Sequence, residues 1–163
     1  MQNKEIAAVY CRLSQDDGSV GESGSIQTQK TLLTQYCQEH RIEIGDYYCD
    51  DGWSGTNFDR PEFKRMLEDI ETGTINLVIV KDLSRFGREY AQMGLYIEHY
   101  FEEKGVRFIS VAENIDSKNG IDNLVLPFTN VINSFYARQA STKTKAAHRA
   151  RVKSGMYIGS RAP

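Results

Sequence analysis

Histidine, cysteine and long apolar runs are scarce in this sequence, and each shortage argues against a class of protein. His40, His99 and His148 are isolated from one another and from the other polar motifs, so histidine-based catalysis is not expected. The three cysteines show no metal-ligand spacing. No uninterrupted apolar run approaches membrane-spanning length, and the N-terminus lacks the apolar stretch of a signal peptide. We therefore expect a cytoplasmic protein with no membrane partner.

Acidic residues are absent from the last part of the chain. All 22 of them lie at or before Asp122, whereas seven of the 20 lysines and arginines follow it, so the earlier part has a net charge of -9. Helical propensity continues from Leu126 to Gly155, over about 45 Å of helix. Its apolar first half could pack on the rest of the protein or on a second copy, and its basic second half could lie along a polyanion. A solvated helix face is the alternative for such a charge run.

Apolar runs of strand length alternate with helical patterns before this basic segment. The alternation predicts an α/β fold, with a mostly parallel central sheet and helices on both faces, followed by a long C-terminal helix. We expect a core over 1–122, the long helix over 123–154 and the start of a further region at 155–163. Cys11 and Cys49 fall in expected strands, where a free thiol is a small core residue. The strands are Ile6–Cys11, Ile42–Cys49, Leu77–Val80 and Val106–Val111, and the helices Ile26–His40, Pro61–Ile70 and Glu89–Lys104.

Residues suited to phosphate chemistry follow the ends of three expected strands. Functional groups collect at the carboxyl ends of parallel strands, so these segments should converge at one edge of the sheet. One hydroxyl surrounded by guanidinium groups is what attack on a phosphodiester requires, because guanidinium groups bind the charge that develops on the phosphate oxygens. The residues are Arg12 and Ser14 after the first strand, Asp51 to Arg60 after the second, and Lys81, Arg85 and Arg88 after the third.

Ser14 gains significance from its neighbours. A serine after a strand is commonly a turn or capping residue. Residues two apart in a strand point the same way, so Tyr10, Arg12 and Ser14 should share a face. Burying Arg12 in the first strand is costly unless it is paired or serves an anion. Asp51 could be its partner, or could orient Arg60.

Four motifs resemble, in the same order, those of the catalytic domain of serine recombinases, the resolvase and invertase superfamily. The likeness covers essentially the whole chain and is strongest to large serine recombinases that excise and insert conjugative or mobilisable transposons. The segment 155–163 resembles the start of the DNA-binding region of that subgroup, so we expect a truncated polypeptide. The motifs are Tyr10-Cys11-Arg12-Leu13-Ser14, Ser25-Ile26-Gln27-Thr28-Gln29, Asp51-Gly52-Trp53-Ser54-Gly55-Thr56 with Asp59-Arg60-Pro61, and Lys81-Asp82-Leu83-Ser84-Arg85-Phe86-Gly87-Arg88.

The resemblance implies a catalytic role for each matching residue. Ser14 would be the nucleophile that forms a covalent 5'-phosphoserine link to DNA, and Arg12, Arg85 and Arg88 would bind the scissile phosphate. The reaction would need no metal or other cofactor and no small-molecule substrate. Further active-site residues would be Arg60, Tyr10, Gln29, Asp51 and Lys81.

The resemblance also implies partners. These are double-stranded DNA and further copies of the chain, as a homodimer and as a tetramer during strand exchange. Arg138 matches a family arginine near the start of the long helix, and the basic half of that helix would contact DNA. Its remaining candidates are Lys143, Lys145, Arg149, Arg151 and Lys153.

Three positions depart from the family pattern. Ser84 stands where resolvases usually have aspartate, and we expect it to cap a helix rather than act as a second nucleophile. Ala137 replaces a glutamate next to the family arginine. The stretch from Asp16 to Gly24 lengthens the loop after Ser14 and is expected to be mobile.

Two other classes of function remain open. A metal-dependent nuclease or phosphatase would use Asp16, Asp17, Asp50 and Asp51 as oxygen ligands, and a chelator would abolish its activity. A non-catalytic flavodoxin-like receiver module would bind magnesium through acidic residues after its first strand. Here the paired aspartates follow the second strand, and the arginine cluster would repel the ion.

Overall fold

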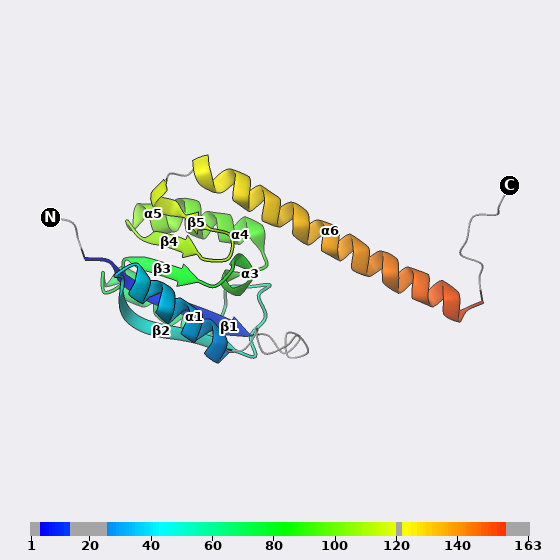
Figure 1. Ribbon diagram of the computed structural model, residues 1–163, viewed down its shortest axis with the longest axis horizontal. Coiled ribbons are helices and arrows are strands. Elements are labelled where there is room, and N and C mark those ends of the chain that lie inside the picture. Colours follow the sequence, from blue (N-terminus) through cyan, green and yellow to red (C-terminus); the bar gives the residue numbers. More distant parts are fainter. Residues whose placement is uncertain (1–3, 14–25, 120–121, 156–163) are drawn as a thin grey trace. The chain divides into compact units, whose positions relative to one another are not determined.

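The structure is a computed structural model that describes residues 4–13, 26–119 and 122–155. The chain divides into two compact units, the first ending at Leu124 and the second starting at Val125. The first is an α/β unit and the second is helical (Figure 1).

The α/β unit is built on a five-stranded sheet with the strand order β2-β1-β3-β4-β5. The first four strands are parallel, and the fifth pairs antiparallel with β4 at the edge. The predicted mostly parallel sheet is therefore confirmed. The strands are β1 (Ile6–Leu13), β2 (Glu43–Asp51), β3 (Leu77–Val80), β4 (Arg107–Ser110) and β5 (Ile115–Asp116).

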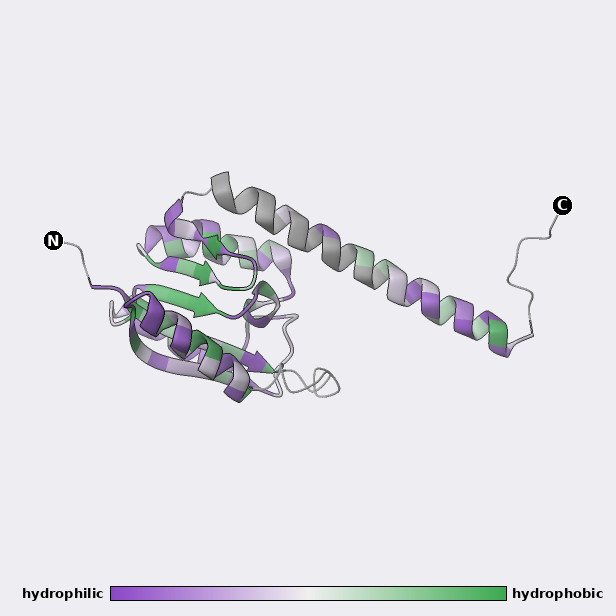
Figure 2. Ribbon diagram, in the orientation of Figure 1, coloured by the Kyte–Doolittle hydropathy of each residue, from purple (hydrophilic) through white to green (hydrophobic). Residues whose placement is uncertain are grey.

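Helices cover both faces of the sheet, as predicted. On one face, α1 (Ile26–Glu39) packs Leu33 and Cys37 against alternate residues of β1, β3 and β4. On the other, Phe63 of α2 (Pro61–Glu71) meets the Tyr10 ring edge-on at 5.7 Å between centroids. Figure 2 shows the apolar residues gathered in the strands, with polar residues along the outer side of α1.

The expected helix Glu89–Lys104 is divided into three pieces. These are α4 (Tyr90–Gly94), a π-helical turn η3 (Leu95–Tyr100) and α5 (Phe101–Glu103). Gly105 ends the segment with a φ of +66°, a conformation that glycine adopts without strain. The apolar repeat predicted the buried face, formed by Met93, Ile97 and Phe101, but the wider π-helical turn leaves no separate periodic signal.

Three short elements were not expected from the sequence. Strand β5 and the 3-10 helix η4 (Ser117–Asn119) are too short to produce a pattern. The short helix α3 (Leu83–Phe86) precedes α4 as a separate turn. The helix α6 spans Asp122–Lys153, so the predicted long helix is confirmed.

Candidate active site

The guanidinium group of Arg12 joins the segments that follow β2 and β3. Arg12 lies near the end of β1 and is fully buried. Its Nη1 donates a hydrogen bond to the backbone oxygen of Trp53 at 2.9 Å, and its Nη2 donates to that of Ser84 at 2.7 Å. Its Nε donates to the backbone oxygen of Arg85 at 3.3 Å. Three segments far apart in the sequence therefore converge at the ends of the strands, as predicted.

The backbone of Arg12 is held by Gln29 of α1, which is also fully buried. The backbone N–H of Arg12 donates to Oε1 of Gln29 at 3.2 Å, and Nε2 of Gln29 donates to the backbone oxygen of Arg12 at 3.0 Å. The same oxygen accepts a hydrogen bond from Nη1 of Arg85 at 3.3 Å. These contacts fix the chain just before it leaves the sheet.

Gly55 allows two arginines to approach its backbone closely. A Cβ at this position would lie 2.9 Å from Nη2 of Arg12 and 3.0 Å from Cγ of Arg88. The backbone N–H of Arg88 donates to the oxygen of Gly55 at 2.7 Å. Gly55 belongs to the third sequence motif, and the structure gives it a steric role between the two arginines.

Arg60 forms a second buried cationic group. It directly precedes α2, and its Nη1 donates to the hydroxyl of Tyr10 at 2.6 Å while its Nη2 donates to the backbone oxygen of Phe86 at 2.7 Å. Its guanidinium carbon lies 4.8 Å from the ring centroid of Phe58 and 5.0 Å from that of Phe63. Burial lowers the pKa of Arg60, and contact with Tyr10 opposes that shift. Among the described residues, its Nε has no hydrogen-bond partner although it is buried.

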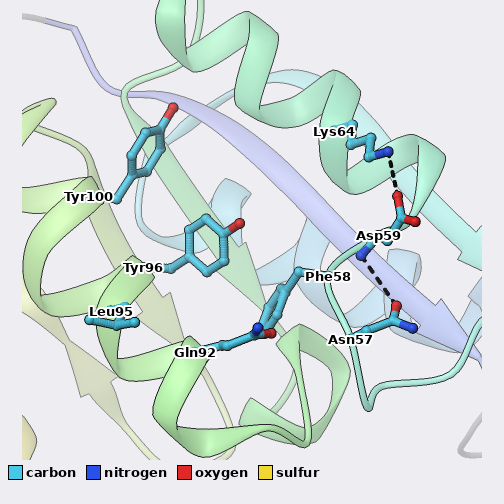
Figure 3. A pocket seen from close by; sticks show the side chains of 8 residues that line it. All are labelled: Asn57, Phe58, Asp59, Lys64, Gln92, Leu95, Tyr96 and Tyr100. Carbon is cyan, nitrogen blue, oxygen red and sulfur yellow. Dashed lines mark hydrogen bonds and ion pairs between the residues drawn. The ribbon is translucent and has the colours of Figure 1, made fainter.

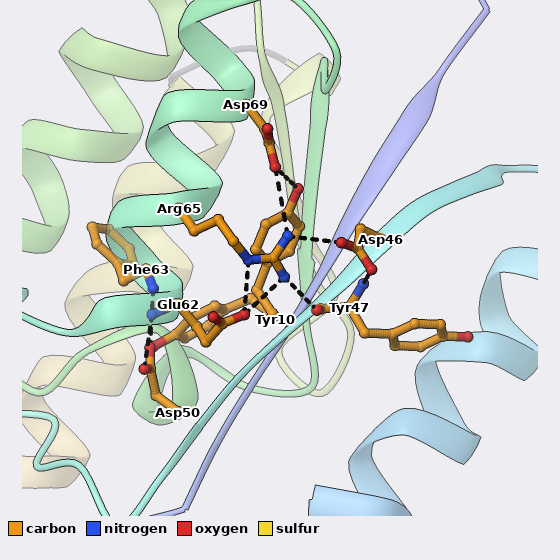
Figure 4. Close-up of polar contacts among 9 residues, drawn as sticks. Tyr10, Asp46, Tyr47, Asp50, Glu62, Phe63, Arg65 and Asp69 are labelled. Carbon is orange, nitrogen blue, oxygen red and sulfur yellow. Dashed lines mark hydrogen bonds and ion pairs between the residues drawn. The ribbon is translucent and has the colours of Figure 1, made fainter.

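Asp50 connects Tyr10 to the start of α2. The hydroxyl of Tyr10 donates to Oδ2 of Asp50 at 2.8 Å, and the backbone N–H groups of Glu62 and Phe63 donate to the same carboxylate at 3.1 Å each (Figure 4). The carboxylate thus binds the helix N-terminus, where negative charge is favourable. Burial, more than Asp50, raises the pKa of Tyr10, which keeps the phenol protonated.

The position of Asp51 requires a correction. The sequence suggested that Asp51 partners Arg12 or orients Arg60, but Asp51 is exposed, and Asp50 makes the contact with Tyr10 that helps hold Arg60. Strand register explains the difference, because Arg12 pairs with Asp50 and Leu13 with Asp51. Neighbouring paired residues share a face. The alternation of Tyr48 and Asp50 along β2 was the signal that could have identified Asp50.

Arg65 attaches α2 to β2 beside this carboxylate. Its guanidinium donates to Oδ2 of Asp46 and to Oε2 of Glu62, both at 2.7 Å, and to the backbone oxygen of Tyr47 at 2.9 Å (Figure 4). This network fixes the helix whose N-terminus Asp50 binds.

The helix α3 is capped by acidic residues rather than by Ser84. Asp82 is the N-cap and accepts a hydrogen bond from the backbone N–H of Arg85 at 3.2 Å. The expected capping role of Ser84 is therefore wrong, and its hydroxyl instead donates to Asp82. Glu113, after β4, accepts from the backbone N–H of Leu83 at 3.2 Å.

The structure describes some of the remaining predicted residues and not others. Arg85, Arg88 and Lys81 are half-buried, and Lys81 directly follows β3. Ser14 lies outside the described residues, as do Asp16 and Asp17 and the side chain of Arg138. In the second unit, the basic side chains of α6 from residue 143 on are exposed, namely Lys143, Lys145, Arg149, Arg151 and Lys153.

A cavity of about 530 Å³ lies between the segment that leads into α2 and the elements α4 and η3 (Figure 3). The ring of Phe58 lines the cavity and also packs on Arg60. Among the described residues no arginine lines the cavity, so it is separate from the arginine cluster. It is lined by Asn57, Phe58, Asp59, Lys64, Gln92, Leu95, Tyr96 and Tyr100.

Across residues 4–13, 26–119 and 122–155, no three histidine, cysteine, aspartate or glutamate side chains gather as a metal site. Within the same ranges, no helix combines the length and the apolar character needed to cross a membrane.

The chain belongs to the family described as "Resolvase, N terminal domain", whose model matches residues 7–157. This match confirms the resemblance drawn from the four motifs. Among curated proteins, the chain is 26% identical over 154 residues to a "Putative DNA recombinase" of Bacillus subtilis (strain 168). That alignment covers 94% of this chain but 29% of the relative, so the chain spans less than a third of its length.

Solved structures of related proteins share the fold. The N-terminal catalytic domain of TP901-1 integrase is 29% identical, with a TM-score of 0.69, over 83% of this chain and 99% of that one. A resolvase family site-specific recombinase from Streptococcus pneumoniae is 26% identical, with a TM-score of 0.63, over 91% of this chain and 99% of that one. The α/β unit therefore has the resolvase-like fold.

Proposed function

We propose that this chain is the catalytic domain of a serine-type site-specific DNA recombinase, which cleaves and rejoins DNA strands through a phosphoserine at Ser14. The observation that carries the proposal is the pair of buried guanidinium groups, Arg12 and Arg60, held at the same edge of the sheet as Arg85 and Arg88. The similarity to a recombinase and to the catalytic domain of an integrase supports it.

The contacts of the two buried arginines suit a phosphate ligand. Arg12 donates to three backbone oxygens, and Arg60 donates to a backbone oxygen and a phenol. These contacts orient both guanidinium groups at the edge of the sheet. Because guanidinium groups bind phosphate oxygens through strong, bidentate hydrogen bonds, an oriented pair of them suits a bound phosphodiester.

The same charges would favour attack by Ser14. Its Oγ would attack phosphorus and displace the 3' oxygen of the neighbouring nucleotide, leaving a 5'-phosphoserine and a free 3'-hydroxyl. Negative charge grows on the phosphate oxygens during attack, and losing one preorganised donor typically costs about 3 to 4 kcal/mol of transition-state stabilisation. The serine ester retains the bond energy, so a 3'-hydroxyl can reverse the attack without a cofactor.

We infer that Tyr10, Gln29 and Lys81 support this site, together with Asp50 and the arginines. Asp51 is exposed, so its part in the site would not be to orient Arg60. The basic side chains of α6, with Arg138, would bind double-stranded DNA. The chain would act in the cytoplasm as a homodimer that forms a tetramer during strand exchange, in the excision and integration of a transposon. The core at 1–122, the helix at 123–154 and the start of a DNA-binding region at 155–163 would be its functional parts.

The test compares Ser14→Ala with Ser84→Ala in a full-length enzyme carrying this domain. Ser14→Ala should bind the DNA site normally but form no covalent protein–DNA adduct, whereas Ser84→Ala should still form it. An adduct that persists in Ser14→Ala would refute the proposal. Loss of wild-type cleavage in the presence of a chelator would favour the metal-dependent nuclease.

A further inference from the structure

Cys11 and Cys49 lie side by side near the ends of two neighbouring strands. They are directly paired in the register of β1 and β2, and β2 is an edge strand. Cys11 is fully buried, Cys49 is half-buried, and each thiol affects the pKa of the other. Adjacent strands are about 4.8 Å apart, within the Cα separation of about 4.4 to 6.8 Å that disulfides span. The pair is therefore placed for a direct bond between the two sulfurs.

A cation from α1 faces Cys49. Lys30 is half-buried, and its Nζ lies 5.1 Å from the ring centroid of Tyr47, which precedes Cys49 by two residues and so shares its face of β2. Its ammonium group also acts on the Cys49 sulfur. Glu62 of α2 also acts on Cys49 and opposes the effect of Lys30.

These groups make Cys49 the more readily ionised thiol of the pair. Interaction with Cys11, followed by the charge of Lys30, lowers the pKa of Cys49 to about 7. The same interaction and burial raise the pKa of Cys11, which remains a thiol. A thiolate is the reactive form of cysteine, so the half-buried member of the pair is the nucleophile.

We propose that Cys49 is a site of oxidative modification that reacts with hydroperoxides and then forms a disulfide with Cys11. The thiolate of Cys49 attacks one peroxide oxygen, the O–O bond breaks, and the product is a sulfenic acid. With hydrogen peroxide, the released hydroxide takes up a proton and leaves as water. The sulfur of Cys11 then attacks that of Cys49, and the displaced hydroxide leaves with the Cys11 proton as a second water. Two thiols are oxidised and one peroxide is reduced.

The bond would form directly beside the candidate active site. Arg12 follows Cys11 on β1, and Asp50 follows Cys49 on β2. On α1, Gln29 holds the backbone of Arg12 while the next residue, Lys30, faces Cys49. Oxidation would therefore link the two strands one residue before the groups that position the guanidinium cluster.

Alkylation rates test the reactive thiolate. Brief treatment with iodoacetamide at pH 7 should label Cys49 at least about tenfold faster than Cys37, since Cys37 is buried and its pKa is raised to about 11. Lys30→Gln should slow the labelling of Cys49 several-fold. The matched control Lys118→Gln, which removes an exposed lysine on the same unit, should not change it. Labelling of Cys49 no faster than Cys37 would overturn the proposal.

Peptide mapping after hydrogen peroxide tests the disulfide. Trypsin separates the three cysteines into the peptides Glu5–Arg12, Thr31–Arg41 and Ile42–Lys64. A non-reducing digest should contain the first and third joined, with the mass of two hydrogens lost. Cys49→Ser should abolish this species and Cys37→Ser should retain it, with circular dichroism confirming that both variants are folded. If the folded protein gives no such species, or joins Cys37 instead, the proposal is wrong. Neither readout involves DNA cleavage, so this result and that of the Ser14 test are independent.

Discussion

At the scale of single residues, the site depends on holding two full charges in the protein interior. Removing Arg12 or Arg60 from water carries a penalty of several kcal/mol, even after relaxation. Arg60 is oriented through Tyr10, which in turn donates to Asp50. The Tyr10 hydroxyl therefore lies between the Asp50 carboxylate and the Arg60 guanidinium. The carboxylate moderates the positive charge of Arg60 without contacting it directly, so the guanidinium can still bind a phosphate.

Replacing Asp50 tests this series of hydrogen bonds, and replacing its neighbour Asp51 provides the comparison. Asp50→Asn should lower the free energy of unfolding by about 1 to 3 kcal/mol. The reason is that the N–H₂ group of the asparagine would face N–H and O–H groups whose hydrogen bonds the buried carboxylate accepts. Asp51→Asn is the matched control, and as an exposed change it should cost less than about 0.5 kcal/mol. Urea unfolding of the two variants measures both values. Equal losses would show that the two aspartates do not differ as the strand register implies.

At the scale of elements, Arg107 fastens the edge of the sheet. From β4 it donates to both oxygens of Asp116 on β5, at 2.9 and 2.6 Å, and to Glu5, which directly precedes β1, at 2.8 Å. Such bidentate pairs are stronger than neutral hydrogen bonds. A strand of two residues is thereby held although it contributes little apolar surface.

Acid should release this edge. Burial alone would raise the pKa of Asp116, but hydrogen bonds from Arg107 and from the backbone N–H of Lys118 outweigh it and lower the pKa below 3.8. A carboxylate with a depressed folded-state pKa stabilises the protein above its unfolded pKa, and this contribution is lost as the pH falls through the folded value. Asp116→Asn should cost about 1 to 3 kcal/mol at pH 7. The difference from wild type should shrink as the pH falls from about 4 toward 2 in chemical unfolding experiments. A difference that stays constant over that range would contradict this linkage.

Elements also show what the sequence could predict. The four parallel strands and α1, α2 and α6 follow from apolar periodicity, since a buried face repeats at a fixed interval. The division of 90–103 around a π-helical turn does not, because Met93, Ile97 and Phe101 have the same spacing in either helix. The choice of Asp50 over Asp51 depends on the register between β1 and β2, which pairs Arg12 with Asp50 and is a tertiary property. The contacts of Arg12 with backbone oxygens could not be predicted either, because every residue type has a backbone oxygen.

At the scale of the whole molecule, charge is separated along the chain. All 22 acidic residues lie at or before Asp122, while the described part of α6 carries five exposed basic side chains after residue 140. An acidic unit followed by a basic helix favours contact with a polyanion through the helix. Binding by that helix would release counterions, so its strength should depend on salt.

Salt dependence of DNA binding measures this contribution. If all seven basic residues after Asp122 meet phosphates, the slope of log K against log salt should approach about -6. Changing the five exposed residues of α6 (Lys143, Lys145, Arg149, Arg151 and Lys153) to glutamine should reduce its magnitude by about 4 to 5. Lys64→Gln with Lys104→Gln, which removes two charges of the α/β unit, should leave it unchanged. An unchanged slope in the helix variant would show that α6 does not touch DNA.

If the guanidinium cluster directs one serine onto a DNA phosphate, mapping the covalent linkage will identify that serine. The adduct of a full-length enzyme with a nicked suicide substrate would be digested with nuclease and trypsin and sequenced by mass spectrometry. We expect a 5'-nucleotide attached to Ser14 within the peptide Leu13–Lys30. Attachment to any other residue, or cleavage without a covalent intermediate, would show that Ser14 is not the nucleophile.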